Sequence, residues 1–351
     1  QIAAETCQYL KFNMWGRLKA NYTPYAINNS LQIKANYQDE VTRRMPVKAI
    51  SQLAIDYPKA GLITENIGSN QDSQHMTMFG VAYQGVHYVG GCNTRYGAYP
   101  YCEVMDLPSY STSKTTFGAY GLMRLEQLYP GSQKDLKVAD WVPECPKLRW
   151  GDVSLENLLD MATGNYDSVM SHADESSKKK LTECFEVDQD AKLIGFACAY
   201  PRNATPGATF VYHTSDTYIL GRALNTYYQS KTTNAKDFWR DDMVENLWKP
   251  LGLSPTMLTT KRTYDSRAQP FTGYGLTYHR DDVVKLAEFL NKDRGKINDK
   301  QMLDSDMLEA SLNLGKGGLI AGRPVDKYNN GLWYYDINAD ASFDYGCASS
   351  K

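Results

Sequence analysis

The pattern of apolar and polar residues predicts a chain of mixed strands and helices. From residue 76, MTMFGVAYQGVHYVGG contains two β-rich runs joined by a short turn at Gln84-Gly85, which is a hairpin signal. The stretch TTFGAYGLMRLEQL then predicts an apolar helix that stops near Tyr129-Pro130-Gly131. Three later helices are predicted over HTSDTYILGRALNTYY, KDFWRDDMVENLWKPLG and RDDVVKLAEFLNK, and a strand over GLWYYDI at 331–337.

The middle of the chain adds one more helix and a highly charged stretch. In VSLENLLDMATG, Ser154 is a helix-start signal and Gly164 is the signal that ends the helix. The following stretch, SHADESSKKKLTE, is interpreted as a solvated loop or an exposed helix end because it is dense in charge.

Residues 1–70 have the weakest patterns. TCQYLKFNMWGRLKANY favours a short amphipathic helix, and SLQIKANY alternates like a strand. We interpret this region as an N-terminal extension and assign it no further structure.

Composition and charge narrow the function classes. The chain has 351 residues, of which 42% are hydrophobic, enough for about two domains with a substantial core. Its net charge of −2 provides no electrostatic attraction toward nucleic acid or an anionic membrane. No apolar run approaches the ~20 residues that span a bilayer. The chain begins at Gln1 without a basic and apolar leader, so we expect a mature, processed product.

The 7 cysteines bear on the compartment. None forms a Cys-x-x-Cys pair and no His lies at zinc-ligand spacing, so no metal site is expected. Cys92 and Cys102 flank the loop NTRYGAYPY, which favours a disulfide-closed loop; the other pairings stay open. Glycosylation sequons begin at Asn21, Asn28 and Asn203. We favour a secreted or periplasmic protein; the alternative is a cytosolic protein with free, buried thiols and sequons that arose by chance.

The stretch SYSTSK, residues 109–114, carries the candidate chemistry. In Ser-x-x-Lys at a helix start, residues i and i+3 lie on one face, so the Lys114 amine can reach the Ser111 hydroxyl. The helix N-terminus favours a developing anion, and a partly buried lysine has a lowered pKa that suits it to act as a base. The motif alone is weak, and the alternative is that Ser111 only caps a helix.

The same spacing occurs twice more, as Ser176/Lys179 and Ser177/Lys180. Both pairs lie in the charged ESSKKK run, so we expect them to be solvated. Only the first motif lies between a predicted hairpin and a long apolar helix. This context favours Ser111 over the other two serines as a nucleophile.

Further passages follow in the order of a known family. They are LKVADWVPE, WGDVSLENLLDMATG, PGATFVYHTSDTYILGRALN, LWKPLGLSPT and FTGYGLTYHRDDVVKLAEFL. With the Ser-x-x-Lys motif, they resemble the serine hydrolases of the β-lactamase and penicillin-binding-protein superfamily over roughly residues 76–340. The resemblance is closest to class C β-lactamases, the esterases related to them and 6-aminohexanoate-dimer hydrolase.

The resemblance implies a fold and three catalytic residues. Ser111 matches the acyl-accepting nucleophile, Lys114 the lysine that takes or relays its proton, and Tyr212 the tyrosine that exchanges a proton with the serine or the leaving group. The implied α/β (α+β) fold has an antiparallel sheet flanked by helices. It occupies residues 71–351, with an inserted, mainly helical subdomain at roughly 130–270 and a central, buried helix over 111–128.

This chain departs from the family in two places. Thr214 stands where class C β-lactamases have Asn, which argues against β-lactam substrates, and His213 before it is expected to face solvent. The family's third motif, on an inner strand, should follow GLWYYDI, but the chain reads NADASFDYGCASSK and stops. With Cys347 as the odd cysteine near this end, we expect a second chain or fragment to supply the C-terminal strands by docking on the 76–91 hairpin.

The sequence therefore predicts a serine hydrolase that works through an acyl-enzyme. The expected substrate is a small-molecule or short linear ester or amide, and no cofactor, nucleic acid partner or membrane span is expected. The alternatives are a penicillin-recognising peptidase or β-lactamase, an acyltransferase, and a non-catalytic scaffold of the same fold.

Overall fold

The computed structural model describes residues 2–5, 13–16, 19–60, 67, 77–94, 97–235, 237–312, 318–321 and 326–335. The chain divides into two compact units that interleave along the sequence. The first contains residues 1–109, 248–260 and 276–288, and the second contains residues 110–247, 261–275 and 289–351. The domain boundary that we placed at residue 70 stays a prediction.

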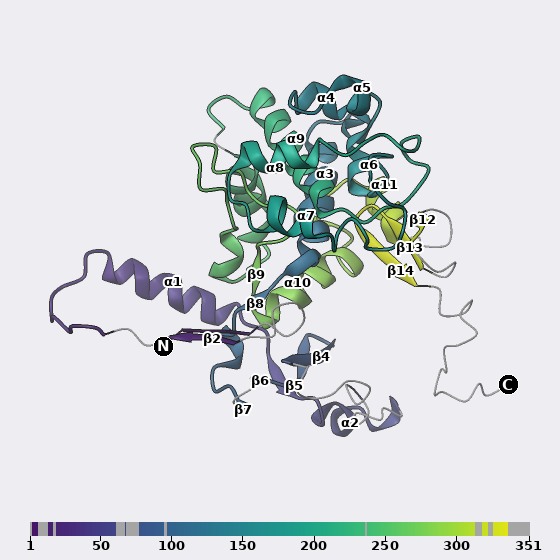
Figure 1. Cartoon of the computed structure of the whole chain (residues 1–351). Helices are drawn as coiled ribbons and strands as arrows, with labels where there is room; N and C mark the ends of the chain where they lie inside the picture. The colour runs from purple at the N-terminus through teal and green to yellow at the C-terminus, as the bar shows by residue number, and fades with distance from the viewer. Residues whose placement is uncertain are drawn as a thin grey trace. The chain divides into compact units, whose positions relative to one another are not determined.

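The first unit combines short strands with a few helices (Figure 1). Its helical segments are α1 (Ser30–Thr42), α2 (Gln52–Asp56), η1 (Pro58–Ala60), η4 (Cys102–Val104), η10 (Pro255–Leu258) and most of α10 (Arg280–Asn291). Its strands are β1 (Ile2–Glu5), β2 (Asn13–Gly16), β3 (Val47–Ala49), β4 (Met78–Tyr83), β5 (Val86–Gly91), β6 (Asn93–Thr94), β7 (Gly97–Ala98), β8 (Leu107–Pro108) and β9 (Thr277–Tyr278). In the sheet β3-β5-β4, β5 pairs antiparallel with β4 and parallel with β3, whereas β1–β2, β6–β7 and β8–β9 are antiparallel pairs.

The β4–β5 hairpin confirms the first sequence prediction. Its turn residues Gln84 and Gly85 both have positive φ, at 51° and 76°, as a two-residue turn matched to the strand twist requires. A disulfide between Cys92 and Cys102 closes the loop beyond β5, as the sequence suggested.

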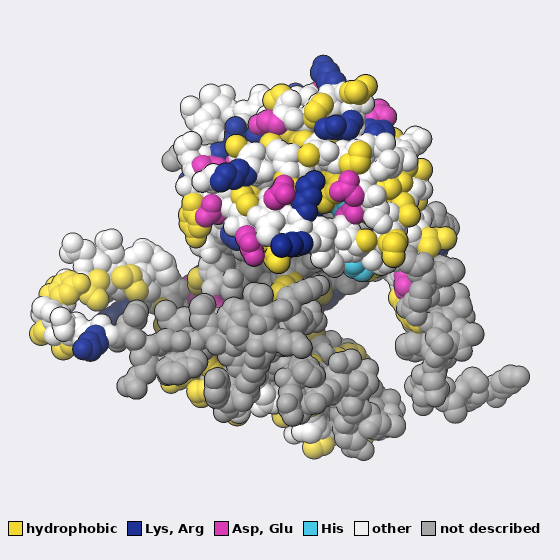
Figure 2. All heavy atoms as spheres, viewed as in Figure 1, with side chains coloured by type: hydrophobic (Ala, Val, Ile, Leu, Met, Phe, Trp, Pro, Cys, Tyr) yellow, Lys and Arg dark blue, Asp and Glu magenta, His cyan; other side chains and the backbone are white. Residues whose placement is uncertain are grey.

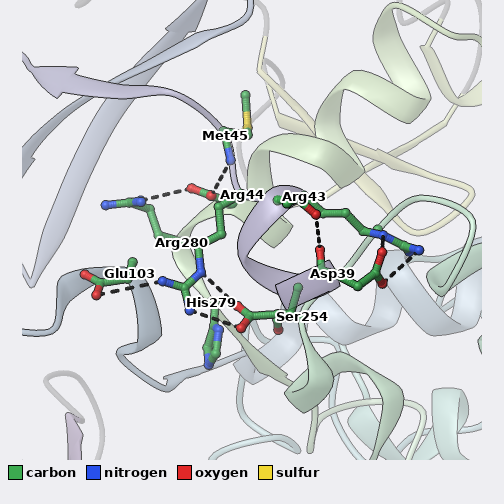
Figure 3. Close-up of polar contacts among 12 residues, drawn as sticks. Asp39, Arg43, Arg44, Met45, Glu103, Ser254, His279 and Arg280 are labelled. Carbon is green, nitrogen blue, oxygen red and sulfur yellow. Dashed lines mark hydrogen bonds and ion pairs between the residues drawn. The ribbon is translucent and has the colours of Figure 1, made fainter. Parts of the chain in front are cut away.

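The strand-like alternation of SLQIKANY does not produce a strand, because these residues form the first turns of α1. No residue of α1 is buried, and the apolar side chains of Leu31, Ile33 and Tyr37 are all exposed. Pairs four residues apart support the helix: Gln32 donates to Asn36, and Arg43 forms an ion pair with Asp39 (Figure 3). The amphipathic helix expected before it falls partly outside the described residues, and where it is described, Asn13–Gly16 is strand β2.

A polar cluster joins the start of α10 to two other segments of the first unit (Figure 3). The backbone N–H of Met45 donates to Asp281 Oδ2 at 2.9 Å, and Arg280 Nε donates to Asp281 Oδ1 at 3.0 Å. The backbone N–H of Ser254 donates to Asp282 Oδ1 at 2.7 Å. Burial favours the neutral form of Asp281. Its hydrogen bonds with His87, the Met45 N–H and Arg280 outweigh this and hold the pKa of Asp281 well below its usual range.

The second unit is mainly helical (Figure 1). Its α-helices are α3 (Tyr120–Leu128), α4 (Val138–Trp141), α5 (Lys147–Trp150), α6 (Leu155–Leu159), α7 (Lys178–Lys180), α8 (Asp190–Ala197), α9 (Thr214–Lys231) and α11 (Ser305–Leu312). Other turns are the 3-10 helices η5 (Tyr110–Thr112) and η7 (Gln133–Asp135) and the π-helices η6 (Lys114–Ala119), η8 (Leu181–Phe185) and η9 (Trp239–Trp248), whose last residue belongs to the first unit. Strands β10 (Lys296–Ile297) and β11 (Lys300–Gln301) pair antiparallel, and β12 (Leu319–Ile320), β13 (Asp326–Asn329) and β14 (Leu332–Tyr335) form an antiparallel sheet.

Most helix predictions for residues 111–292 are confirmed. Segment 111–128 is helical nearly throughout, with η6 and α3 in its place, and side chains such as Phe117 and Leu122 are at most 2% exposed. Both η6 and α3 pack against α9 (Figure 1). The predicted cap of α6 is a reciprocal pair, because Ser154 Oγ accepts from the backbone N–H of Asn157 while Asn157 Oδ1 accepts from that of Ser154. The segments α9, η9, α10 and β14 occupy the other predicted positions.

A second disulfide, Cys145–Cys198, joins the α4–α5 connection to the end of α8 and was not predicted. Cys184 is the free cysteine among the residues that the structure describes, and it is buried. Cys347 lies in 336–351, outside the described residues, as does the place where the third family motif was expected. The second chain or fragment expected to supply C-terminal strands therefore stays a prediction.

The surface carries both signs of charge. On the face drawn in Figure 2, basic and acidic side chains are interspersed among polar and apolar ones, in keeping with the net charge of −2. Within the described part of the chain, no helix is long and apolar enough to cross a membrane.

Candidate active site

Ser111 and Lys114 lie at the start of the long helical segment. Ser111 belongs to η5 and is exposed, whereas Lys114 opens η6 and is only 2% exposed. Lys114 Nζ lies 2.9 Å from Ser111 Oγ, within hydrogen-bond distance. Tyr110, just before the serine, has a φ of 43°. Residues other than glycine rarely adopt this left-handed conformation, and those that do are often found at functional sites.

Two further contacts hold the lysine amine. Lys114 Nζ donates to Thr214 Oγ1 at 2.9 Å, at the start of α9, and to the carbonyl oxygen of Gly273 at 3.0 Å. Position 273 must be glycine for this approach, because a Cβ there would lie 2.6 Å from Thr217 Oγ1 and 2.7 Å from Thr214 Cγ2. Residues far apart in the sequence thus fix the amine beside the serine.

Burial changes the acid–base behaviour of Lys114. The pKa of its amine falls to about 7, mainly because burial removes water from the charged form; the carboxylate of Glu175 opposes this shift, and the positive charge of the nearby Lys180 adds to it. A pKa near neutrality leaves a large fraction of the amine uncharged at pH 7. An uncharged amine at hydrogen-bond distance from a hydroxyl is able to accept its proton.

The Tyr212 ring lies next to the same amine. Lys114 Nζ is 5.0 Å from the ring centroid. The same ring stacks on Trp333 at 6.0 Å between centroids and lies 5.4 Å from the His172 ring. The indole of Trp333 is half exposed, at 49%. The structure therefore brings Ser111, Lys114 and Tyr212 into one neighbourhood, and the roles assigned to them stay predictions.

A carboxylate contacts Thr214, and a second lysine pairs with that carboxylate. Glu175 Oε2 accepts from the backbone N–H of Thr214 at 2.9 Å, and Glu175 Oε1 accepts the Thr214 hydroxyl proton. Lys180 Nζ forms an ion pair with Glu175 Oε2 at 3.4 Å and donates to Ser215 Oγ at 2.8 Å. Burial favours the neutral acid, but Lys180, Lys114 and the Thr214 donors outweigh it and lower the pKa of Glu175.

Sequence comparison decides the family. The family model described as beta-lactamase matches residues 107–305, which include every side chain of this site except Trp333. The chain belongs to the beta-lactamase family. No curated protein matches the chain by sequence.

Solved structures share the beta-lactamase fold with this chain. A protein from Bacillus anthracis described as a 6-aminohexanoate-dimer hydrolase has a TM-score of 0.59 at 18% identity, covering 85% of this chain and 74% of its own. The hydrolase EstCE1, described as having promiscuous acyltransferase activity, has a TM-score of 0.52 at 16% identity, covering 88% of this chain and 85% of its own. A penicillin binding protein from Bacillus halodurans has a TM-score of 0.51 at 15% identity, covering 73% of this chain and 78% of its own. Such identities establish the fold and leave the substrate open.

Membership of the beta-lactamase family supports serine hydrolase chemistry in general. It agrees with the mixed α and β architecture predicted from the sequence. Among the described residues, no group of three or more His, Cys, Asp or Glu side chains is placed to hold a metal ion.

The expectation that the charged run of this beta-lactamase family member is solvated is wrong for Lys180. Its side chain is fully buried, and the rings of Phe196, Phe185 and Tyr200 lie 5.5, 5.9 and 6.0 Å from its Nζ. Aromatic faces and the Glu175 carboxylate replace the water that a lysine normally keeps. The sequence offered no local signal for this, because Lys178 and Lys179 beside it are exposed.

The expectation that His213 faces solvent is also wrong. The ring is fully buried, stacks on Tyr200 at 4.4 Å between centroids, and has Nε2 2.9 Å from Asp174 Oδ2 and Nδ1 3.6 Å from Asp216 Oδ1. Burial alone lowers the pKa of His213, but the two carboxylates outweigh it and raise the pKa. This buried group anchors the backbone between Tyr212 and Thr214, and the His-x-x-Asp spacing at the helix start was the available sequence signal.

Proposed function

We propose that this chain is a secreted serine hydrolase that cleaves an ester or amide through an acyl-enzyme on Ser111. The proposal rests on one observation above all, the 2.9 Å contact between Ser111 Oγ and an amine whose pKa is about 7. The exposed serine is accessible to a substrate, while the buried lysine is kept from water and from protonation.

The chemistry proceeds in two stages. Ser111 Oγ attacks the carbonyl carbon of the substrate while Lys114 accepts the hydroxyl proton, and Tyr212 relays a proton to the departing alcohol or amine. Water then attacks the acyl carbon, the Ser111–acyl bond breaks, and the serine hydroxyl recovers its proton as the acid leaves. The backbone N–H of Ser111, at the start of the helical segment, is suited to the negative charge on the carbonyl oxygen.

The neighbours of the site favour simple esters or amides over β-lactams. Thr214 supplies a hydroxyl and no amide, and its hydroxyl is already engaged by Lys114 and Glu175. The half-exposed Trp333 beside Tyr212 offers an apolar surface for an acyl group. Two disulfides are typical of an oxidising compartment, which supports the secreted or periplasmic location we propose.

A fluorophosphonate probe tests the nucleophile. We expect the wild-type chain to be labelled and to hydrolyse p-nitrophenyl acetate, and Ser111→Ala to lose both properties while keeping its circular dichroism spectrum. Ser176→Ala is the matched control, because this exposed serine shares the Ser-x-x-Lys spacing. Absence of labelling in the wild type supports the scaffold alternative, and faster turnover of nitrocefin than of the ester supports the β-lactamase alternative.

A further inference from the structure

The direction of the hydrogen bonds around Lys114 follows from the acceptors that surround it. The Gly273 carbonyl only accepts, so one N–H of Lys114 must point to it. An ionised Glu175 also only accepts, so the Thr214 hydroxyl proton must point to Glu175. The Thr214 oxygen is then free to accept, and it takes a second N–H from Lys114.

This arrangement leaves one position on the amine for Ser111. A neutral amine has two N–H groups and one lone pair. With both N–H groups committed to Gly273 and Thr214, the lone pair faces Ser111 Oγ at 2.9 Å. That is the orientation in which Lys114 accepts the serine proton.

We propose that Glu175, held in place by Lys180, is a positioning residue that orients the lone pair of Lys114 toward Ser111 through the Thr214 hydroxyl. This inference rests on the proposed function, because it assigns a purpose to a base that acts on Ser111. Glu175 contacts neither the nucleophile nor the reacting atoms; it acts by fixing which way one hydroxyl points.

The buried lysine keeps the carboxylate ionised and in place. Lys180 is fully buried and reaches Glu175 Oε2 at 3.4 Å, and the Glu175 side chain is only 13% exposed, so water screens this pair little. Ser177, at the N-cap of α7, accepts from the backbone N–H of Lys180 and fixes the start of the turn that carries the lysine. The other titratable groups that interact with these two charges or with Lys114 are Tyr212 and Tyr200, Cys184 in η8, Tyr274, and His213 with Asp216 at the start of α9. Asp174 reaches this group only through its ion pair with His213.

Glu175→Gln tests the proposal, because the amide has nearly the same shape but is able to donate a hydrogen bond to Thr214. The Thr214 hydroxyl then turns its proton toward Lys114 and occupies the lone pair. We expect kcat to fall by about tenfold to a hundredfold, with KM little changed. We also expect the acid limb of the kcat/KM profile to move to lower pH, because the lost carboxylate no longer favours protonated Lys114.

Two comparisons separate positioning from a merely structural role. Thr214→Val removes the relaying hydroxyl and should lower kcat, whereas Thr214→Ser keeps it and should restore most of the activity. In the Thr214→Val background, adding Glu175→Gln should lower kcat by less than about twofold, because the hydroxyl that links Glu175 to Lys114 is already absent. A structural role predicts instead the same loss of kcat in both backgrounds.

Matched controls lie in the same run of sequence. Lys180→Met should lower kcat because Glu175 loses its partner, while Lys178→Met, at an exposed neighbour, should not. Glu183→Gln is the matched control for Glu175→Gln and should leave kcat unchanged, since Glu183 is exposed. If a Glu175 variant unfolds, the Thr214 pair still decides the question.

The outcomes distinguish this inference from the proposed function. A wild-type chain that neither labels with fluorophosphonate nor hydrolyses the ester overturns the proposed function. A wild-type chain that labels normally, with Glu175→Gln matching it in kcat and in acid limb, overturns only the positioning role. Full activity in Thr214→Val overturns it as well.

Discussion

Replacing Lys114 with methionine should stabilise the protein while abolishing its activity. Lys114 is 2% exposed, and burial lowers its pKa from 10.5 to about 7. The unfolded chain therefore binds this proton more tightly than the folded chain does. It follows that the lysine destabilises the folded state most at low pH, and that its cost declines as pH rises from about 7 toward 10.5.

The magnitude follows from the two pKa values. Their difference means that Lys114 destabilises the folded state by about 5 kcal/mol at low pH, where the amine is protonated in both the folded and the unfolded chain. Between pH 6 and pH 9 the cost falls by about 3 kcal/mol, because only the folded amine has lost its proton. Methionine leaves the Gly273 carbonyl without its donor, which costs about 1–3 kcal/mol, so the net gain at pH 6 is about 2–4 kcal/mol.

Urea unfolding of the wild type and Lys114→Met at pH 6 and pH 9 measures this effect. The free energy of unfolding of the variant should exceed that of the wild type at pH 6, and the excess should shrink at pH 9. Lys178→Met, which removes an exposed lysine, should show no such pH dependence. An equal difference between wild type and Lys114→Met at both pH values would refute the reasoning.

Three further predictions concern catalysis and stability. The kcat/KM for an activated ester should rise with pH through about 7 as Lys114 loses its proton, and a flat profile from pH 5.5 to 8.5 in a stopped assay would contradict its role as base. Tyr212→Phe should lower kcat by about 10²–10⁴ in steady-state kinetics, whereas Tyr264→Phe, at a side chain that is 85% exposed, should not; equal activity in both would remove Tyr212 from the proton path. The double replacement of Cys145 and Cys198 by serine should lower the free energy of unfolding by about 4 kcal/mol, since this disulfide bridges residues 53 apart, and an unchanged urea midpoint would argue against the bond.

Local patterns in the sequence were sufficient for much of the fold. The hairpin turn at Gln84-Gly85 and the cap at Ser154 depend on residues adjacent or three apart, so their geometry follows from backbone and side-chain preferences. The strand-like alternation of SLQIKANY did not lead to a strand, for a complementary reason. An alternating pattern forms a strand only where a sheet edge is available, and α1 buries none of its residues.

The sequence by itself determined the pairing of Ser111 with Lys114, because a separation of three residues in a helical segment places both on one face. It did not determine what surrounds the amine. Thr214 and Gly273 reach Lys114 from 100 and 159 residues away, and Glu175 reaches Thr214 from 39 residues away.

Only the tertiary structure decided which charged residues are buried. Lys178 and Lys180 are identical in type and two positions apart, yet one is exposed and the other is fully buried beside Glu175. A charge leaves water only where a counter-charge, hydrogen-bond partners and a closed apolar shell meet it at once. Those partners come from segments distant in the sequence, so the pKa of Lys114 and the network behind it are properties of the folded chain.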